Sequence, residues 1–393
     1  MKILDIKVSG YKMLPDNFEI NLVPRIKVLE KDLETEIAEI DDKLYSFSTI
    51  SFVGSNSSGK TTILRLIEMS QLLITNGEII FNPEDFNEDV INLTIYFYFN
   101  GYIYKYECTL EKPILSLNIN DVRSYCVASN EKIFRKEYIR TVKKELLENI
   151  NETFKLAKED KSIVKYLAKM INSFEGDMRP IFFPAIGSGE NILKVFLLYK
   201  QSLSPILISY FISILDDSIE KIEPINNNKN SGDFYTFKRK NHKERTISLE
   251  CLVNILSSGT IKGLLLYLYS YITLLYGSSL IVDEIERSFH KDLVDNIILL
   301  FNDADINVNH STLIFSTHYL EIIDTINRRD SIFVMHKNDS IISADNMYDK
   351  YPFRNELSKS NQYNSNAFNT HSNYETLMKI KNLITEDIQK KKK

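Results

Sequence analysis

The chain has 393 residues, a hydrophobic content of 44% and a formal net charge of −5. This composition excludes wholesale disorder, leaves room for two domains or one elaborated domain, and provides no global attraction to nucleic acid. Three cysteines lie far apart without a CxxC pair, which argues against a disulfide framework or a zinc site. The N-terminus does not resemble a signal peptide, and the longest apolar stretch, 264–276, is too short to span a bilayer. We therefore expect a cytoplasmic protein, and the high Ile, Asn and Lys usage is typical of an AT-rich bacterial coding sequence.

The first part of the chain predicts a β-rich unit. Polar and apolar residues alternate, or apolar residues run together, in predicted strands at 2–9, 18–22, 47–53, 93–99 and 102–110. The last two strands flank Asn100-Gly101, a dipeptide typical of a two-residue hairpin turn. The acidic segment 28–43 reads as a solvated helix or loop at an edge.

Residues 54–61 read GSNSSGKT and stand between the predicted strand 47–53 and a helical run that begins near Ile63. A strand, a glycine-rich loop and a helix in this order form a phosphate-binding loop, in which backbone N–H groups and the helix N-terminus face a polyphosphate. Lys60 is expected to reach the β- and γ-phosphates, and the Thr61 hydroxyl to bind Mg²⁺. The loop predicts binding of ATP or GTP. The residues expected to contact the nucleotide here are Gly54, Asn56, Ser57, Ser58, Gly59, Lys60, Thr61 and Thr62.

From about residue 129 to residue 215 the apolar spacing becomes helical, and 234–239 with 245–249 then suggests a hairpin. The α/β pattern returns at the end of the chain. Strands are predicted at 279–282, 313–316 and 331–336, and helices at 289–303 and 318–326.

These patterns predict an α/β fold with a nucleotide-binding core that is split in the sequence. Lobe I is 1–128 and includes an N-terminal antiparallel β subdomain, a mainly helical insertion covers 129–244, and lobe II is 245–345. The last segment, 346–393, is polar and ends in four lysines, so we expect its final residues to be disordered.

Lobe II carries three short motifs that can complete a nucleotide site. The apolar run LIV at 280–282 leads into Asp283, placed to hold Mg²⁺ through water, and Glu284, placed to polarise the water that attacks the γ-phosphate. Ser258-Gly259 opens the long apolar helix and is either an anion site or part of an ordinary helix cap. His318 follows the strand 313–316 and can reach a γ-phosphate, whereas a lone histidine is usually only a satisfied polar residue. The motifs predict an ATPase with Glu284, Lys60 and His318 as catalytic residues, and ATP and Mg²⁺ as substrate and cofactor.

The order of the motifs carries a family resemblance. A phosphate loop, a long insertion, a Ser-Ser-Gly helix, an Asp-Glu strand and a strand-ending histidine resemble the ABC-type ATPases, within them the SMC-like branch, and most closely the OLD-type and abortive-infection ATPases of bacterial phage defence. DEIE at 283–286 followed by His290 is similar to the "DExE…H" ending of that branch. The resemblance covers most of 1–345 and implies an ABC-ATPase-like core with a mixed sheet.

The same resemblance implies a head-to-head dimer or a higher homo-oligomer. In such a dimer the phosphate loop, Asp283, Glu284 and His318 of one subunit would meet Ser258 and Gly259 of the other across ATP. The sequence departs from the pattern in that SSGT at 257–260 replaces Ser-Gly-Gly-Gln. No glutamine stands at a convincing strand end in lobe I, so the Mg²⁺-linked glutamine is unassigned. The insertion shows no sustained heptads, which argues against a long coiled-coil arm.

OLD proteins carry a Toprim nuclease domain after the ATPase, and the roughly fifty residues after Asp345 are too few for one. The resemblance therefore implies that any nuclease activity resides in a separate effector chain.

Partner binding rests on a basic segment. Residues 132–144 are predicted to form a helix with Lys132, Arg135, Lys136, Arg140, Lys143 and Lys144 on one side. A second basic run follows at 238–245. Such a stripe is a solvated face, a protein-docking surface or a phosphate-contacting surface for nucleic acid.

Two functions stay open on the sequence. The first is the ATPase subunit of a bacterial anti-phage system that senses infection and controls a separate effector. The second is a RecF-like DNA repair or recombination ATPase that binds DNA.

Overall fold

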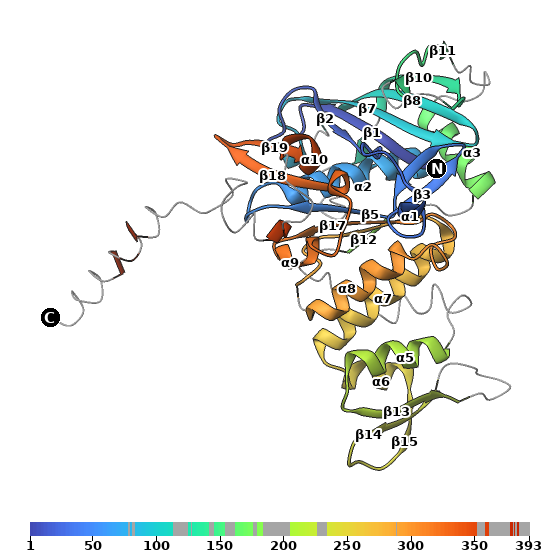
Figure 1. Cartoon of the computed structure of the whole chain (residues 1–393), viewed down its shortest axis with the longest axis vertical. Helices are drawn as coiled ribbons and strands as arrows, with labels where there is room; N and C mark the ends of the chain where they lie inside the picture. Colours follow the sequence, from blue (N-terminus) through green and yellow to red (C-terminus); the bar gives the residue numbers. More distant parts are fainter. Residues whose placement is uncertain are drawn as a thin grey trace.

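The structure is a computed structural model. It describes residues 1–77, 79–80, 83–112, 125–126, 128–140, 145–153, 162–175, 179–183, 205–225, 234–287, 289–351, 358–360, 378–379, 381 and 383–384. In this part of the chain two large β-sheets lie one above the other with helix α2 (Lys60–Asn76) between them (Figure 1). Further helices cover the opposite face of the lower sheet, and a small α/β unit extends from them.

The lower, core sheet is mostly parallel. In spatial order its strands are β12 (Ile181–Phe183), β16 (Ser279–Val282), β17 (Thr312–Thr317), β5 (Thr49–Val53), β18 (Ile332–Asn338) and β19 (Ile341–Asn346). Neighbouring strands are parallel except β18 with β19. All residues of β5, β16 and β17 are buried, which explains why these strands read as continuous apolar runs. The carboxyl ends of these three strands therefore meet at one edge of the sheet.

The upper sheet is antiparallel throughout. In spatial order its strands are β11 (Glu152–Thr153), β10 (Ala128–Glu137), β8 (Tyr102–Glu111), β7 (Val90–Phe99), β1 (Lys2–Ser9) and β2 (Phe18–Asn21). β7 and β8 form the predicted hairpin, and Asn100 and Gly101 have φ angles of 46° and 79°, as a two-residue turn with positive φ requires. One face of the sheet packs on α2 in a continuous apolar core that includes Ile6, Ile95 and Ile63.

Helices and small sheets complete the fold. The larger helices are α3 (Ile163–Glu175), which packs on α2, and α7 (Ser258–Tyr276) and α8 (Lys291–Asn302), which belong to the core on the other face of the core sheet. The unit at the bottom of Figure 1 contains α5 (Pro205–Leu215), α6 (Leu249–Ile255), β13 (Ile219–Pro224), β14 (Phe234–Arg239) and β15 (Arg245–Ser248). The short elements are α1 (Glu30–Leu33), β3 (Ile37–Asp41), β4 (Leu44–Phe47), β6 (Ile79–Ile80), β9 (Tyr125–Cys126), α9 (Leu320–Ile323) and α10 (Met347–Lys350). None of the helices in the described part of the chain is both long and apolar enough to traverse a membrane.

The prediction of a mainly helical insertion is wrong in its described part. Residues 128–137 form strand β10 instead of the start of a basic helix, because the open edge of β8 offers a full set of backbone partners from Tyr102 to Leu110. β12 lies in the middle of the predicted insertion and yet pairs in parallel with β16 of the core sheet. Helices α3 and α5 are the part of this prediction that the structure confirms.

Most other predicted elements are confirmed, with small changes at their ends. The predicted helix 318–326 is only the short α9, and the acidic segment 28–43 contains α1 and β3. Glu36 in that segment is not solvated: it is 4% exposed and accepts hydrogen bonds from the backbone N–H groups of Asn327 and Arg328 at 2.6 and 2.7 Å. The predicted basic tail at the C-terminus lies outside the described residues.

Candidate nucleotide-binding site

The glycine-rich loop, 54–61, connects the end of β5 to the start of α2 at the carboxyl edge of the core sheet. Two positions of the loop have no space for a side chain, because other atoms lie close to their backbone. A Cβ on Gly54 would lie 2.7 Å from the carbonyl oxygen of Met335, and one on Gly59, where φ is +98°, would lie 2.6 Å from the Ile342 side chain. Asn56 and Ser57 are exposed at the tip of the loop. The backbone is therefore held in a tight curl whose outer residues face solvent.

The loop and the helix behind it supply the donors that an anion needs. α2 begins at Lys60, so the first N–H groups of the helix, including those of Thr61 and Thr62, have no acceptor within the helix. Ser58 is 2% exposed, and its hydroxyl has no hydrogen-bond partner among the described residues. A phosphate group fits this curl because it would accept from the helix N-terminus and from such a hydroxyl.

The amino group of Lys60 lies at the centre of the site and is almost completely buried. Its Nζ donates to the carbonyl oxygens of Gly54 and Ser55, each at 2.9 Å, and lies 3.2 Å from Nδ1 of His318. Burial lowers the pKa of Lys60 to about 8, although the nearby carboxylates, Asp283 first, oppose this shift. A polyphosphate would restore the charged form of this lysine, since it brings negative charge into contact with Nζ.

Asp283 at the end of β16 is held from two sides. Its Oδ2 accepts a hydrogen bond from the Thr61 hydroxyl at 2.8 Å, and its Oδ1 accepts one from the Ser316 hydroxyl at 2.6 Å. A hydroxyl and a carboxylate side by side are the hard oxygen donors that Mg²⁺ prefers. Residues 222 positions apart in the sequence thus form the predicted metal pair, and the donor set fits Mg²⁺.

Glu284 and His318 lie next to this pair. The backbone of Glu284 has a φ of 50°, and its N–H donates to the Ser316 hydroxyl at 2.7 Å. Its carboxylate lies 3.4 Å from Nε2 of His318 and 2.9 Å from Nη1 of Arg287. Nδ1 of His318 is 3.0 Å from the Gly54 carbonyl oxygen. The three residues predicted to be catalytic therefore converge at the mouth of the loop.

Two residues of the site were missed by the sequence reasoning. Ser316 connects Asp283 to the Glu284 backbone, as described above. Glu286 is 8% exposed and accepts a hydrogen bond from the backbone N–H of His318 at 2.7 Å. The DEIE motif contains Glu286, but its sequence pattern gives this residue no role beyond the resemblance that it shares with His290. That histidine instead caps the N-terminus of α8. Ser316 has no signal in the sequence, because its role depends on β17 lying beside β16.

Ser258 and Gly259 are not brought to the loop. They open α7, where the neighbouring Ser257 caps the helix by accepting from Thr260 N–H, and α7 lies on the opposite face of the core sheet from α2 (Figure 1). Ser258 is exposed, and in the part of the chain that is described no hydrogen bond joins either residue to 54–61. A Cβ on Gly259 would meet only the Ser257 hydroxyl, at 3.8 Å. No residue that the structure describes therefore requires a glycine at that position.

The predicted basic helix is absent from the described residues, and its side chains are engaged differently. On strand β10 Arg135 pairs with Glu152 at 2.9 Å, and Lys136 donates to the main-chain carbonyl of Glu145 at 2.9 Å. Lys132 and Arg140 are exposed. Lys143 and Lys144 lie outside the described residues. The residues do not form one basic stripe, because alternate residues of a strand point to opposite faces of the sheet.

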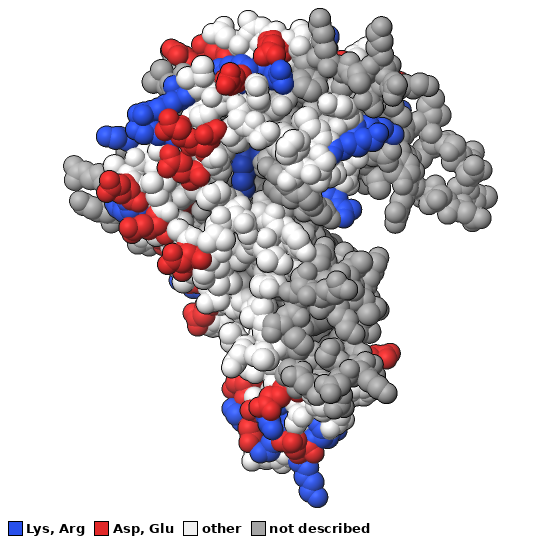
Figure 2. Space-filling view, turned by 90° about the vertical axis from the view of Figure 1, so that its right-hand side faces the viewer, with Lys and Arg blue, Asp and Glu red and all other residues white. Residues whose placement is uncertain are grey.

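Two residues of the second basic run are paired with nearby acids. Lys238 pairs with Glu220, and Arg239 with Asp216 at 3.7 Å. Figure 2 shows basic and acidic side chains interleaved at this end of the molecule. A single-sign surface that would follow a nucleic-acid backbone is thus not formed by these residues.

The comparisons with known proteins agree with the P-loop geometry. Residues 50–324 match a family model described as "AAA domain, putative AbiEii toxin, Type IV TA system". The chain belongs to this family. The match begins in β5, just before the phosphate loop, and ends just after α9, so it includes all the motifs described above. Family membership supports nucleotide binding by a P-loop ATPase core, while the narrower likeness to OLD-type ATPases stays a prediction.

Two solved structures are similar in outline. The SMC head domain from Thermotoga maritima has 11% sequence identity and a TM-score of 0.44, with 88% of this chain and 98% of that chain covered. The cbiO1 subunit of the ABC transporter complex cbiONQ from Clostridium perfringens has 12% identity and a TM-score of 0.31, with 88% and 89% covered. Likenesses this weak carry no argument about this protein. A comparison with curated proteins finds no match.

Proposed function

We propose that the chain binds and hydrolyses ATP at the loop 54–61. The observation that carries this proposal is the convergence of Thr61 with Asp283, which is 222 positions away in the sequence, and with the adjacent Glu284. Thr61 donates directly to Asp283, and Ser316 connects Asp283 to the Glu284 backbone. A P-loop that only bound nucleotide would not need an acid directly after the Mg²⁺-binding aspartate. Family membership supports the same reading.

Each side chain has a separate task in this proposal. Lys60 neutralises the phosphate oxygens, and Glu284 accepts a proton from the attacking water. His318, next to both, orients the end of the phosphate chain and the glutamate. Thr61 and Asp283 would hold Mg²⁺, which when bound neutralises charge on the phosphates. Ser316 and Glu286 keep the acid and the histidine in position.

We further propose that the catalytic site is completed by a second copy of the chain. Gly59 is a glycine because its own chain leaves no space for a Cβ, whereas a Cβ on Gly259 would meet only the Ser257 hydroxyl, at 3.8 Å, among the described residues. A glycine without an internal reason is expected where a partner or a ligand approaches the backbone closely. Ser258 and Gly259 of one subunit are therefore assigned to the ATP bound by the other, in a head-to-head arrangement.

In the cell, the proposed role is that of an ATPase subunit in a bacterial anti-phage system that controls a separate effector, such as a Toprim-type nuclease. The description of the family, which names a toxin of a toxin–antitoxin system, supports a defence role. The alternative is a RecF-like DNA-binding ATPase. The basic helix that would have contacted DNA is not formed in the described residues, because Lys132, Arg135 and Lys136 lie on β10 and Arg135 pairs with Glu152.

Steady-state phosphate release and equilibrium binding of a fluorescent ATP analogue test the enzymatic proposal. Glu284→Gln should lower the turnover of ATP by about 10²- to 10³-fold while analogue binding changes little, because the amide cannot accept the proton. Glu321→Gln is the matched control: it makes the same chemical change on an exposed residue of α9 and should turn over ATP at the wild-type rate. Wild-type turnover by Glu284→Gln would show that another group activates water.

Phage plating tests the cellular proposal. Cells that carry the chain with its neighbouring gene should reduce plaque formation, and Lys60→Ala should remove this protection. Protection that persists in Lys60→Ala would separate defence from nucleotide binding. ATP turnover that rises severalfold with added DNA would instead favour the repair function.

A further inference from the structure

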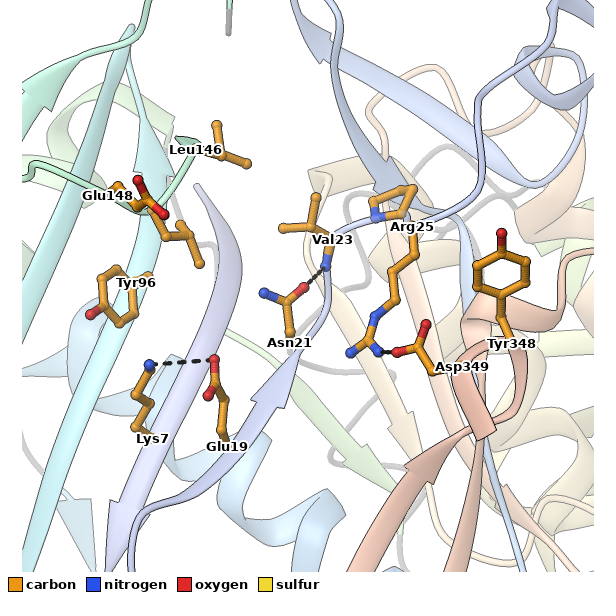
Figure 3. Close-up of a pocket in the computed structure, with 12 residues that line it drawn as sticks. Lys7, Glu19, Asn21, Val23, Arg25, Tyr96, Leu146, Glu148, Tyr348 and Asp349 are labelled. Atoms are coloured by element: carbon orange, nitrogen blue, oxygen red, sulfur yellow. Dashed lines mark hydrogen bonds and ion pairs between the residues drawn. The ribbon is translucent and has the colours of Figure 1, made fainter. Parts of the chain in front are cut away.

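A cavity of about 650 Å³ lies on the face of the antiparallel sheet that points away from α2. Its lining comes from β1, β2 and β7, from the segment 23–25, from residues 146–148, and from α10. In Figure 3 Tyr96 and Glu148 stand on one side, Arg25, Tyr348 and Asp349 on the other, and Lys7, Glu19 and Asn21 between them. The nucleotide site lies on the other side of this sheet, so the two sites are distinct.

The walls of the cavity combine apolar and aromatic surface with charged groups. Val23, Pro24, Leu146 and Leu147 supply aliphatic surface, and Tyr96 and Tyr348 supply rings. The Tyr96 ring already accepts a cation, because Nζ of Lys7 lies 5.8 Å from its centre. Such walls suit a ligand that has an apolar stem.

Four of the charged side chains that line the cavity form two ion pairs, and the fifth is a carboxylate. Lys7 pairs with Glu19 at 3.4 Å, and Arg25 pairs with Asp349. In the described ranges no ion pair involves the carboxylate of Glu148, since Lys136 contacts the main-chain carbonyl of this residue. The Glu148 side of the cavity therefore carries an exposed carboxylate, which interacts electrostatically with Lys136 but forms no direct ion pair in the described ranges.

A second acid, Asp5, lies beneath the floor of the cavity. Asp5 on β1 is paired in register with Asn21 of β2 and Tyr96 of β7, so its side chain is on the same face of the sheet as these two lining residues. Asp5 is 0% exposed, and its polar neighbours are the side chains of Glu19 and Asn21 and the charge of Lys7. A buried carboxylate is costly to a folded protein, and a cation bound nearby would lower that cost.

We propose that this cavity binds an organic cation, that is, a protonated amine or a guanidinium group carried on an apolar stem. The charged head lies against Glu148 and the Tyr96 ring, above the buried Asp5, and the stem lies along Val23, Leu146 and Leu147. A free diamine and the side chain of a basic peptide share this chemistry, and the experiment below distinguishes them.

Binding should be coupled to the release of a proton from Asp5. Burial, followed by the neighbouring Glu19, raises the pKa of Asp5 to about 8, so that the group is mostly protonated at neutral pH. The other charged or titratable groups that face it are Lys7 on the same strand, Tyr96 on β7 and Arg25 after β2, and Lys7 and Arg25 stay protonated in this range. A cation favours the ionised carboxylate, so affinity should rise as the pH rises from 7 to about 8.5 and then level off.

Isothermal titration calorimetry of the full chain tests the site with agmatine and cadaverine as free cations and with the blocked tripeptide acetyl-Gly-Arg-Gly-amide as the peptide source. We expect saturable binding of at least one cation with a Kd on the order of 1 mM or tighter. Tighter binding of the tripeptide than of agmatine would assign the site to a basic segment of a protein, and the reverse would assign it to a small amine. Glutarate, a dianion of similar length to cadaverine, should not bind.

Two variants and one control make the test specific. Glu148→Gln should weaken cation binding by about tenfold, and Asp5→Asn should abolish proton release, measured by titration in buffers of different ionisation enthalpy. Glu137→Gln makes the same change as Glu148→Gln on an exposed residue that does not line the cavity, and binding should stay within about twofold of wild type. Melting curves check that each variant is folded. Glutarate binding as tight as cation binding, absence of cation binding by folded wild type at 10 mM, or unchanged binding by Glu148→Gln would overturn the proposal.

Discussion

The phosphate loop and the start of α7 carry the two glycine-containing motifs of this chain, and they differ in what surrounds them. Gly54 and Gly59 are closed in by Met335 and Ile342, and Lys60 is 5% exposed with partners on several sides. A Cβ on Gly259 would meet only Ser257 among the described residues, and Ser258 faces solvent. The described neighbours of the loop thus explain its glycines, whereas those of the α7 start do not explain Gly259. This difference supports our proposal that each subunit presents the start of its α7 to the nucleotide bound by a second copy.

The largest effect is expected for a substitution in the phosphate loop. Lys60→Ala removes the buried ammonium group that faces the phosphates, so ATP binding should weaken by at least about 100-fold and turnover should be undetectable. Equilibrium binding of a fluorescent ATP analogue measures the change. Lys337→Ala, at an exposed lysine on β18, is the control and should bind like wild type. If Lys60→Ala keeps its affinity, the loop is not the main phosphate contact.

The next substitution separates the role of the α7 start from that of the phosphate loop. Ser258→Arg should block turnover while each subunit still binds ATP, because the substitution obstructs only the surface that is presented to the partner. Mixing Ser258→Arg with Lys60→Ala should restore part of the activity, since a mixed dimer contains one site with both an intact loop and an intact α7 start. Loss of ATP binding by Ser258→Arg on its own would mean that both motifs act within one chain.

Dilution of the wild-type protein tests whether the active site needs two subunits. Specific ATPase activity should fall on dilution, in parallel with the loss of dimers in size-exclusion chromatography, because a lone subunit lacks the second set of donors. A constant specific activity at concentrations where only monomers elute would contradict the composite site.

A smaller effect is expected for the serine that positions the acids. Ser316→Ala deletes the hydroxyl that donates to Asp283 and accepts from the Glu284 backbone, so the turnover number should fall by about tenfold while ATP affinity changes by less than about threefold. Phosphate release at saturating ATP and analogue binding measure these two quantities. Equal losses in affinity and turnover would indicate a structural defect instead of misplaced acids.

The smallest effect is expected far from the phosphate loop and the α7 start. Lys132→Glu with Arg140→Glu changes exposed residues of β10 and the segment after it, so ATPase activity should stay within about twofold of wild type. Filter binding of DNA across a range of salt concentrations should show the same weak retention for the variant and the wild type. A clear loss of salt-sensitive DNA binding would restore the nucleic-acid interpretation of this segment.

Structural features that depend on residues close together in the sequence could be predicted from it, whereas features that depend on contacts between distant segments could not. The parallel strands β5, β16 and β17 were predictable because burial on both faces makes them continuous apolar runs. The β7–β8 hairpin was predictable from Asn100-Gly101. β10 was not, because the apolar spacing of the chain after residue 129 also suits a helix, and only the free edge of β8 decides between the two. Glu36 likewise lies among solvated acids in the sequence and becomes buried only through contact with Arg328 and its neighbour.

The same distinction holds for the chemistry. GSNSSGKT and the acids at the end of β16 are recognisable without a structure, because a curled backbone, a lysine and paired carboxylates are needed at fixed local spacings. Three features came only from the tertiary structure: the role of Ser316, the contact of Glu286 with the His318 backbone, and the position of the buried Asp5 under a cavity. Each of these depends on which strands lie side by side. Strand pairing is set by burial and backbone hydrogen bonding across the whole chain, and no short stretch of sequence contains that information.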